Sequence, residues 1–217
     1  MSMHQSIINL NLIEKELKLK EFKLPSIIAV SKTFSISNIL PLLEYGHVHF
    51  GENKVQEAVE KWSEVKKKYG NIKLHMIGKL QTNKVKFALP LFDYIHSLDN
   101  EKLAEKLSVE QKKNNQKPKL FIQVNIGDED QKNGVNKKDL ENFYKYCLSL
   151  DLDIIGLMCI PPIDLDSTKF FKEMELLKRK INLRELSMGM SNDYLSATMN
   201  SSTFLRIGSK IFGKRIT

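Results

Sequence analysis

A lysine stands directly after the first strongly apolar run of the chain. The run covers Ile27–Ser31, and Lys32 follows it. A lysine at the end of a buried strand is poorly solvated, and desolvation lowers the pKa of its amine and makes it a nucleophile toward carbonyl groups. This position could therefore form a Schiff base with an aldehyde. If the strand ends one residue earlier, Lys32 is an ordinary surface charge, and position alone does not decide between the two interpretations.

Two loops late in the sequence combine glycine with hydroxyl side chains. The first follows Ser187 and contains Gly189 and Ser191, and the second contains Gly208 and Ser209. Glycine lets a backbone approach a ligand closely, and Ser191 could cap the next helix, whose first N–H groups favour an anion. Each loop alone is a weak signal, because such turns are common. Together they predict a phosphate cradle, and an amine beside it fits a ligand with both an aldehyde and a phosphate.

Other candidate residues lie near the ends of further apolar runs. Asn53 and His75 could contact the ring of a bound ligand or satisfy backbone groups. Met158 could pack on the face of that ring, although methionine more often fills a core. Glu52 is a carboxylate at the same level without an obvious partner for acid–base work. The sequence therefore predicts binding residues and no catalytic residue.

The histidines and cysteines do not predict a metal site. His47 and His49 share one face of a strand, but two ligands without a third carboxylate or thiolate make a poor site. Cys147 and Cys159 form no CxxC pair. Two thiols in 217 residues indicate a reducing compartment and no disulfide framework.

Apolar runs alternate with helical patterns along the sequence, and these elements must position the candidate residues. Runs rich in Ile, Val, Leu and Phe are typical of strands buried on both faces of a parallel sheet. Eight strands are predicted, at Ile27–Ser31, Val48–Gly51, Leu74–Gly78, Tyr94–Ser97, Leu120–Ile126, Ile154–Ile160, Glu185–Gly189 and Phe204–Gly208. Helices are predicted between them, at Ser37–Tyr45, Lys54–Lys68, Lys84–Leu89, Asn100–Lys113, Asp139–Ser149, Ser167–Lys180 and Ser191–Met199. Asp99, Asp139 and Ser191 stand at expected N-cap positions.

Eight β/α units predict a single (β/α)8 barrel of the TIM type, preceded by an extra amphipathic helix over Met1–Lys20. An open doubly wound sheet is less well supported, because no G-x-G-x-x-G motif follows a predicted strand. The chain is short for such a barrel, which typically has about 250 residues. We therefore expect tight loops and one domain over residues 1–217. In such barrels the active site lies at the carboxyl ends of the strands, which is where Lys32 and the two glycine loops fall.

Composition and charge narrow the function classes. The formal net charge is +8, but the basic residues are scattered among acidic ones and no aromatic residues interleave with them. We therefore expect no nucleic-acid binding. The sequence contains no window of about 18 uninterrupted apolar residues, so we expect no membrane span. The first residues lack the features of a secretory signal, so we expect a cytoplasmic protein.

Seven short segments are informative in their order and spacing. They are Ala29-Val30-Ser31-Lys32; Phe50-Gly51-Glu52-Asn53 with Val55-Gln56-Glu57; His75-Met76-Ile77-Gly78 with Leu80-Gln81-Thr82-Asn83-Lys84; Lys132-Asn133-Gly134; Gly156-Leu157-Met158; Ser187-Met188-Gly189-Met190-Ser191-Asn192-Asp193; and Arg206-Ile207-Gly208 with Ile211-Phe212-Gly213. With these segments the chain resembles, nearly end to end, the family of pyridoxal phosphate-binding homeostasis proteins. Several segments would be unremarkable singly, but the set is highly specific.

The resemblance implies a fold, a cofactor and roles for several residues. It implies a barrel related to the N-terminal domain of alanine racemase and pyridoxal 5′-phosphate held by Lys32 as an internal aldimine. It places the phosphate near Ser191, Gly208 and Ser209, and it places Arg206 beside the pyridine nitrogen. Ser209 stands where the family usually has threonine, and the hydroxyl group is kept.

The resemblance also implies a function in cofactor homeostasis, without established catalytic turnover. A carrier of this kind binds pyridoxal phosphate, buffers the free aldehyde and passes it on; apoenzymes that use the cofactor are candidate recipients, and we expect a monomer. A fixed cation at Arg206 disfavours protonation of the ring nitrogen and makes the ring a weaker electron sink.

The alternative function is an amino-acid racemase of the alanine racemase type. Racemization needs two bases on opposite faces of the substrate, and Lys32 could be one of them. In alanine racemase the second base is a tyrosine from another domain, and no tyrosine of this chain is an evident substitute. The enzyme hypothesis therefore ranks below the carrier.

Overall fold

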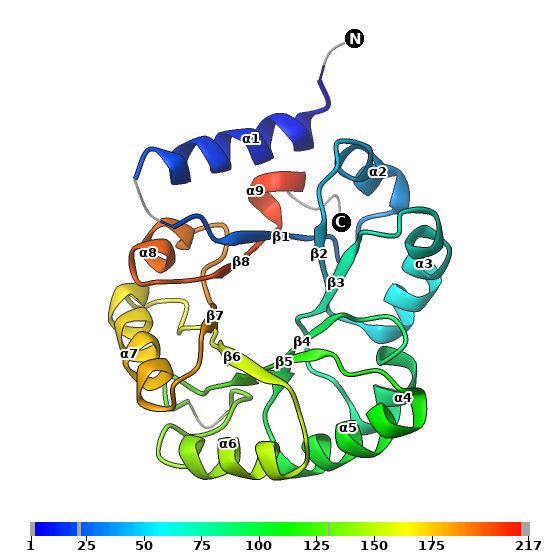
Figure 1. Cartoon of the computed structure of the whole chain (residues 1–217). Helices are drawn as coiled ribbons and strands as arrows, with labels where there is room; N and C mark the ends of the chain where they lie inside the picture. Colours follow the sequence, from blue (N-terminus) through cyan, green and yellow to red (C-terminus); the bar gives the residue numbers. More distant parts are fainter. Residues whose placement is uncertain (1–2, 21–22, 130, 214–217) are drawn as a thin grey trace.

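The strands of the molecule close into a barrel. The structure, a computed structural model, describes residues 3–20, 23–129 and 131–213. Within these residues eight parallel strands pair in sequence order, and the last pairs with the first (Figure 1). The strands are β1 (Ser26–Val30), β2 (His49–Glu52), β3 (Lys73–Met76), β4 (Tyr94–Leu98), β5 (Lys119–Gln123), β6 (Ile154–Met158), β7 (Glu185–Ser187) and β8 (Phe204–Ile207). The predicted TIM-type (β/α)8 fold is confirmed.

Helices surround the barrel; those between β1 and β8 connect successive strands, and α9 follows the last strand (Figure 1). They are α2 (Ile36–Glu44), α3 (Val55–Lys68), η1 (Thr82–Lys84) with α4 (Val85–Ala88), α5 (Glu101–Asn114), α6 (Leu140–Ser149), α7 (Ser167–Lys180), α8 (Tyr194–Met199) and α9 (Ser209–Phe212). The predicted extra helix is also present as α1 (Gln5–Lys18). Met1 and Ser2, which the prediction included in this helix, lie outside the described residues.

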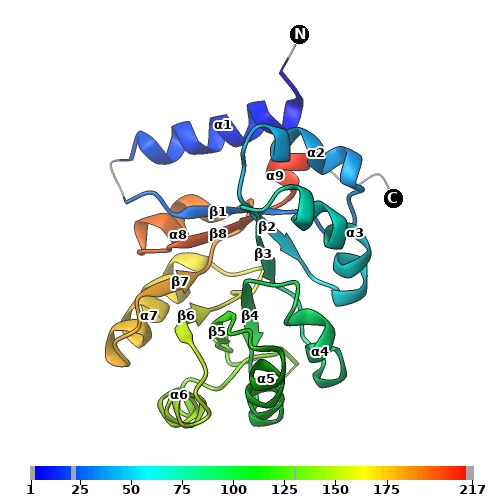
Figure 2. The same cartoon turned by 45° about the vertical axis from the view of Figure 1, so that its right-hand side comes forward.

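Helix α1 covers the outside of the barrel beside α9, near the pairing of β8 with β1 (Figures 1 and 2). Its buried face includes Leu10, Ile13 and Leu17. The amide of Asn9 donates a hydrogen bond to the carbonyl of Ile211 in α9 at 2.9 Å. Among the helices of the described residues, none combines the length and the apolar character that a membrane span requires.

Several predicted boundaries are wrong. The N-cap of α5 is Asn100, whose side chain accepts a hydrogen bond from the N–H of Leu103, and not Asp99. Helix α8 begins only at Tyr194, with Asp193 as its N-cap, so Ser191 does not cap it. Asp139 is the N-cap of α6, as predicted, although its side chain makes no capping hydrogen bond.

Some predicted strands are longer than the observed ones, because apolar residues continue past the end of the barrel ladder. Strand β5 ends at Gln123, and Val124 forms only an isolated bridge with Val135. Strand β3 ends at Met76, before the predicted end at Gly78. Apolar character therefore marks burial here and does not by itself mark strand pairing.

The interior of the barrel is filled with aromatic, imidazole and aliphatic side chains. His75 stacks on Tyr94, and His96 stacks on Phe121, each with ring centroids 4.3 Å apart. Met158 is fully buried and packs in the cluster that Phe121 shares with Ile28 and Phe204. Because side chains occupy the interior, a ligand must bind at one end of the barrel.

Candidate functional site

A cavity of about 670 Å³ lies at the carboxyl ends of the strands. Six of the nine predicted site residues line it: Lys32, Asn53, Ser191, Arg206, Gly208 and Ser209. They come from the ends of β1, β2 and β8 and from the loop after β7, which meet at this end of the barrel. The loop after β6 adds apolar side chains such as Ile160 and Pro162. The cavity therefore combines polar groups from distant parts of the sequence with an apolar wall.

Lys32 lies at the point where the chain leaves the barrel. The preceding residue, Ser31, is fully buried and continues the ladder by donating its N–H to the carbonyl of Gly51 at 2.9 Å. The next residue, Thr33, has a positive φ of 69°. The chain therefore turns sharply around Lys32, whose side chain is half-buried in the lining of the cavity.

Asn53 presents an acceptor that the protein leaves unused. Its side-chain Oδ1 is buried and has no hydrogen-bond partner. Gly78 permits this placement, because a Cβ at position 78 would lie 2.4 Å from the carbonyl oxygen of Asn53. A buried polar atom without a partner is unfavourable, which points to a ligand that supplies a donor here.

The two glycine loops also lie side by side at this cavity. Gly189 has a φ of +91°, and a Cβ there would lie 2.5 Å from the Cβ of Ala197. Ser191 does not cap α8; its hydroxyl oxygen accepts a hydrogen bond from the backbone N–H of Lys210 at 3.3 Å. That bond joins the loop after β7 to the start of α9, which follows Gly208.

Arg206 lies at the wall of the cavity and is only 5% exposed. Its guanidinium donates hydrogen bonds to the carbonyl and hydroxyl oxygens of Ser187, at 2.6 and 2.7 Å, and to the carbonyl of Cys159 at 2.8 Å. Burial lowers the pKa of this guanidinium from its ordinary value, which lies so high that the group stays charged. The cavity therefore has a fixed cation in its wall, and Asp193 adds a carboxylate to the lining.

The other three predicted residues, His75, Met158 and Ser187, do not line the cavity but lie behind it. His75 belongs to a chain of imidazoles inside the barrel: its Nε2 lies 2.9 Å from Nδ1 of His49, and its Nδ1 lies 2.9 Å from Nε2 of His96. Nδ1 of His96 in turn lies 2.8 Å from the hydroxyl of Ser187, which Arg206 contacts. Behind the cavity, a row of hydrogen-bonded side chains thus crosses the barrel interior.

Burial controls the charge of these imidazoles. Desolvation, followed by the positive charge of neighbouring groups, holds the pKa of His75 and His96 well below the usual range. His49 also has a lowered pKa, again chiefly because of burial. The imidazoles of His49, His75 and His96 are therefore neutral at pH 7. His96, which belongs to this hydrogen-bonded row, was not among the residues predicted from the sequence.

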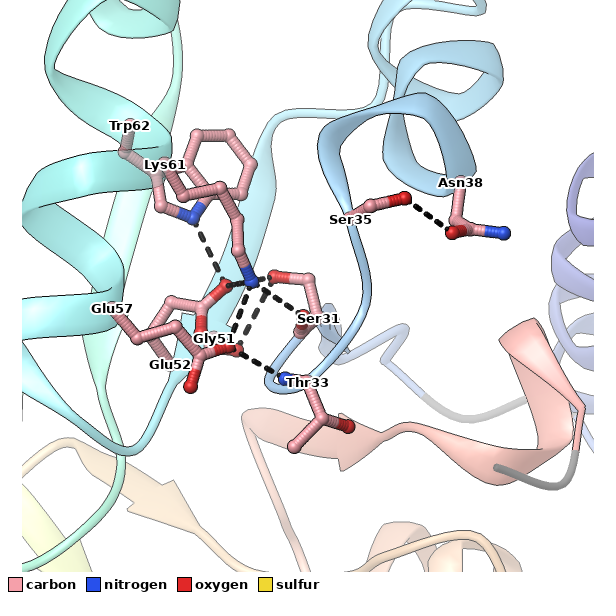
Figure 3. Close-up of polar contacts among 9 residues, drawn as sticks. All are labelled: Ser31, Thr33, Ser35, Asn38, Gly51, Glu52, Glu57, Lys61 and Trp62. Carbon is pink, nitrogen blue, oxygen red and sulfur yellow. Dashed lines mark hydrogen bonds and ion pairs between the residues drawn. The ribbon is translucent and has the colours of Figure 1, made fainter. Parts of the chain in front are cut away.

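Glu52 has a partner that the sequence analysis missed. Its carboxylate contacts Lys61 and Trp62 of α3, on the outside of the barrel wall (Figure 3). Glu52 does not line the cavity. The spacing of Glu57 and Lys61, four residues apart on a predicted helix, was a readable signal for part of this cluster. The described residues contain no group of three or more His, Cys, Asp or Glu side chains that could hold a metal ion.

Comparison with known proteins gives consistent results over most of the chain. The family described as "Alanine racemase, N-terminal domain" matches residues 8–215. A pyridoxal phosphate homeostasis protein of Haemophilus influenzae is 37% identical, with 95% of this chain and 94% of the relative covered. One from Escherichia coli is 33% identical, with 88% and 86% covered.

Solved structures show the same relationship. PipY of Synechococcus elongatus with PLP bound has a TM-score of 0.82 and 34% identity, covering 92% of this chain and 99% of PipY. The same protein without PLP has a TM-score of 0.87 and 32% identity, covering 97% and 100%. A histidine racemase of Leuconostoc mesenteroides, at 13% identity and a TM-score of 0.69, shares the fold, and this chain spans 57% of its length.

Proposed function

Because the chain belongs to the alanine racemase N-terminal domain family, and within it to the pyridoxal phosphate homeostasis proteins, we propose that it binds pyridoxal 5′-phosphate in the cavity at the carboxyl ends of the strands. We propose that Lys32 holds the cofactor through a Schiff base and that the protein stores and passes on the cofactor. The observation that carries the proposal is one cavity lined by a strand-end lysine and by two adjoining glycine loops.

The residues present fit the chemistry of this cofactor. Its aldehyde matches the amine of Lys32, and its hydroxyl-bearing ring offers a donor for the unpartnered Oδ1 of Asn53. Its phosphate matches the hydroxyls of Ser191 and Ser209 with the backbone at Gly208, which together line one wall. When bound, the cofactor supplies an electrophilic aldehyde and an electron-withdrawing ring.

Arg206 supports the storage of a cofactor more than its use in turnover. Its fixed cation lies at the cavity wall, where it disfavours protonation of a ring nitrogen placed beside it. Tyr194, on the neighbouring helix, directs its hydroxyl to Glu16 and Lys210 and is engaged outside the cavity. The names of the relatives describe homeostasis, which agrees with this proposal.

The remaining predicted residues have supporting roles in this proposal. Ser187 bonds the guanidinium that lines the cavity, and His75 is linked to Ser187 through His96. Met158 fills the barrel interior beneath the site. We therefore propose that these residues hold the floor of the cavity and do not touch the cofactor.

We also propose the setting in which the protein acts. Residues 1–217 would form one cofactor-binding domain, acting as a monomer that passes pyridoxal phosphate to apoenzymes. A cytoplasmic, reducing location agrees with two free, buried cysteines, Cys147 and Cys159. Burial raises the pKa of both thiols to about 12, so they are unreactive near pH 7.

An absorption spectrum before and after borohydride reduction, followed by peptide mapping, tests the proposal. We expect a Schiff-base band that reduction traps on Lys32, and we expect the Lys32→Ala variant to lose this band yet unfold cooperatively. Lys79, an exposed lysine just after β3 and outside the cavity, gives a matched control, because Lys79→Ala should keep the band. A wild-type protein without a band after addition of pyridoxal phosphate would show that the proposal is wrong.

A further inference from the structure

A buried ion-pair cluster lies directly behind the loop that carries Lys32 (Figure 3). Its centre is Lys61 of α3, whose ammonium donates hydrogen bonds to the carbonyl of Ser31, to Oε1 of Glu52 and to Oε1 of Glu57, each at 3.0 Å. The side chain of Lys61 is 9% exposed and that of Glu52 is fully buried. We call these four residues, with Trp62, the Lys61 cluster.

The cluster holds the backbone on both sides of Lys32. On one side, the carbonyl of Ser31 accepts from Lys61, and the hydroxyl of Ser31 donates to Glu52 at 2.7 Å. On the other side, the N–H of Thr33 donates to Oε1 of Glu57 at 2.6 Å, the same oxygen that Lys61 contacts. One ammonium group thus ties together the residues before and after Lys32.

The backbone at Thr33 needs this support. Thr33 is a β-branched residue with a φ of 69°, a strained conformation that persists only when surrounding contacts impose it. The short bond from Thr33 to Glu57 is a charge-assisted hydrogen bond of the stronger kind. The turn that directs Lys32 is therefore maintained by a carboxylate on α3.

The composition of the cluster is unusual for a purely structural contact. Burying Glu52 and Lys61 removes both charges from water, and a well-packed apolar cluster of similar volume is often at least as stable. Glu52 recovers part of this cost on Oε1, which accepts from Ser31, Lys61 and the indole of Trp62. Beyond stability, the charged arrangement fixes the geometry of the loop, because its contacts hold particular backbone atoms and side-chain oxygens near Lys32 in place.

We propose that Lys61, with Glu52 and Glu57, positions Lys32 for attack on an aldehyde bound in the cavity. This inference rests on the proposed function, since it gives Lys61 a role in the formation of the Schiff base by Lys32. Lys61 does not line the cavity, so it acts through the Ser31–Thr33 loop and is a positioning residue. A misplacement of the amine by about 1 Å can slow a reaction by roughly 100-fold. The cluster therefore controls the rate of Schiff-base formation more than the binding of the phosphate.

Two probes separate these effects. Stopped-flow absorbance after mixing apoprotein with pyridoxal 5′-phosphate reports Schiff-base formation. Calorimetric titration with pyridoxine 5′-phosphate, which has an alcohol in place of the aldehyde, reports binding without the Schiff base. For Lys61→Met we expect formation to slow by about 10- to 100-fold, with little change in pyridoxine 5′-phosphate affinity. Lys61→Arg, which keeps a cation with several donors, should recover most of the rate.

Lys66 gives a matched control on the same helix. Its ammonium is also partly buried and paired, with Asp93 at 2.7 Å and the carbonyl of Leu91 at 2.8 Å, but it lies away from the Lys32 loop. We expect Lys66→Met to lower the urea midpoint of unfolding and to leave the rate of Schiff-base formation unchanged. A rate in Lys61→Met equal to that in Lys66→Met would overturn the inference, as would equal losses of rate and of pyridoxine 5′-phosphate affinity.

A second variant keeps the test decisive if Lys61→Met does not fold. Glu57 is 28% exposed and can be removed with less disturbance, so Glu57→Ala releases the N–H of Thr33 to solvent. We expect Schiff-base formation several-fold slower than in wild type, and a wild-type rate would refute the inference. The wild-type protein separates the two proposals. If the wild type forms no Schiff base, the proposed function fails. If the wild type forms the Schiff base and the variants do so equally fast, only the role of the Lys61 cluster is contradicted.

Discussion

Acidification from pH 7 to pH 5 should destabilise this protein through the half-buried His47 and the fully buried His75 and His96. Burial holds the pKa of His47 at about 4, against an ordinary value of 6.5. Below pH 6.5 the unfolded chain therefore binds a proton at this histidine that the folded chain does not bind. The contribution of the neutral histidine to the free energy of unfolding is present above pH 6.5 and is lost as the pH falls toward 4. For His47 alone the loss between pH 7 and pH 5 is about 2 kcal/mol. His75 and His96 act in the same direction, because burial also lowers their pKa values.

Urea unfolding at pH 7 and pH 5 measures this loss, and a variant isolates the contribution of one residue. The ring of His47 bonds the carbonyl of His49 at 2.9 Å, which the amide of a glutamine can also reach. In His47→Gln we expect the free energy of unfolding to fall by about 2 kcal/mol less than in wild type over the same pH interval. Unfolded carboxyl groups titrate mainly below pH 5, so they contribute little in this window. A free energy of unfolding that stays constant from pH 7 to pH 5 would refute the reasoning.

Two further predictions concern the cavity. Gly189→Ala should lower the free energy of unfolding by about 2–5 kcal/mol, because the new Cβ meets the Cβ of Ala197 at 2.5 Å and the φ of +91° disfavours alanine. Gly46→Ala is the control, since its φ of +92° is similar but no atom lies within 4 Å of a Cβ, so urea unfolding should show only about 1–2 kcal/mol of destabilisation. Arg206→Gln should move the pH dependence of the bound cofactor's absorption band to higher pH, because loss of the cation favours protonation of the ring. A titration of the band identical to that of wild type would show that Arg206 does not lie beside the ring nitrogen.

The fold could be predicted because compact apolar runs alternate with helical patterns along the sequence, and some of these runs are followed directly by polar residues such as Lys32 and Glu52. The ends of parallel strands converge in a barrel, so Lys32, Asn53 and Arg206 could be assigned to one site from their places in the sequence. The residues inside the barrel were harder to place. His75 is one register step below the rim, paired with Gly51, and the alternation of a strand does not show how deep a side chain lies.

Apart from the Glu57–Lys61 pair on one helix, the contacts behind the site could not be predicted, because they join residues whose spacing carries no signal. Glu52 and Lys61 meet across the gap between a strand end and a helix face, and His96 meets Ser187 across the barrel. The N-cap at Ser191 was predicted wrongly for a related reason. A serine before a helical pattern is a common cap, but here three turn residues precede α8, and the hydroxyl bonds Lys210 instead.

The hydrogen bonds behind Arg206 have a direction, because a guanidinium can only donate. Ser187 accepts from Arg206, and the positive charge of Arg206 favours the arrangement in which the hydroxyl of Ser187 donates to Nδ1 of His96. His96 then carries its proton on Nε2 and donates to His75, which donates from its Nε2 to Nδ1 of His49. In this arrangement the three rings share one tautomer, and their dipoles are aligned in a row that begins behind the cavity and runs through the barrel interior to His49. The permanent charge at one end of the barrel thus favours one position of a hydrogen atom at the other.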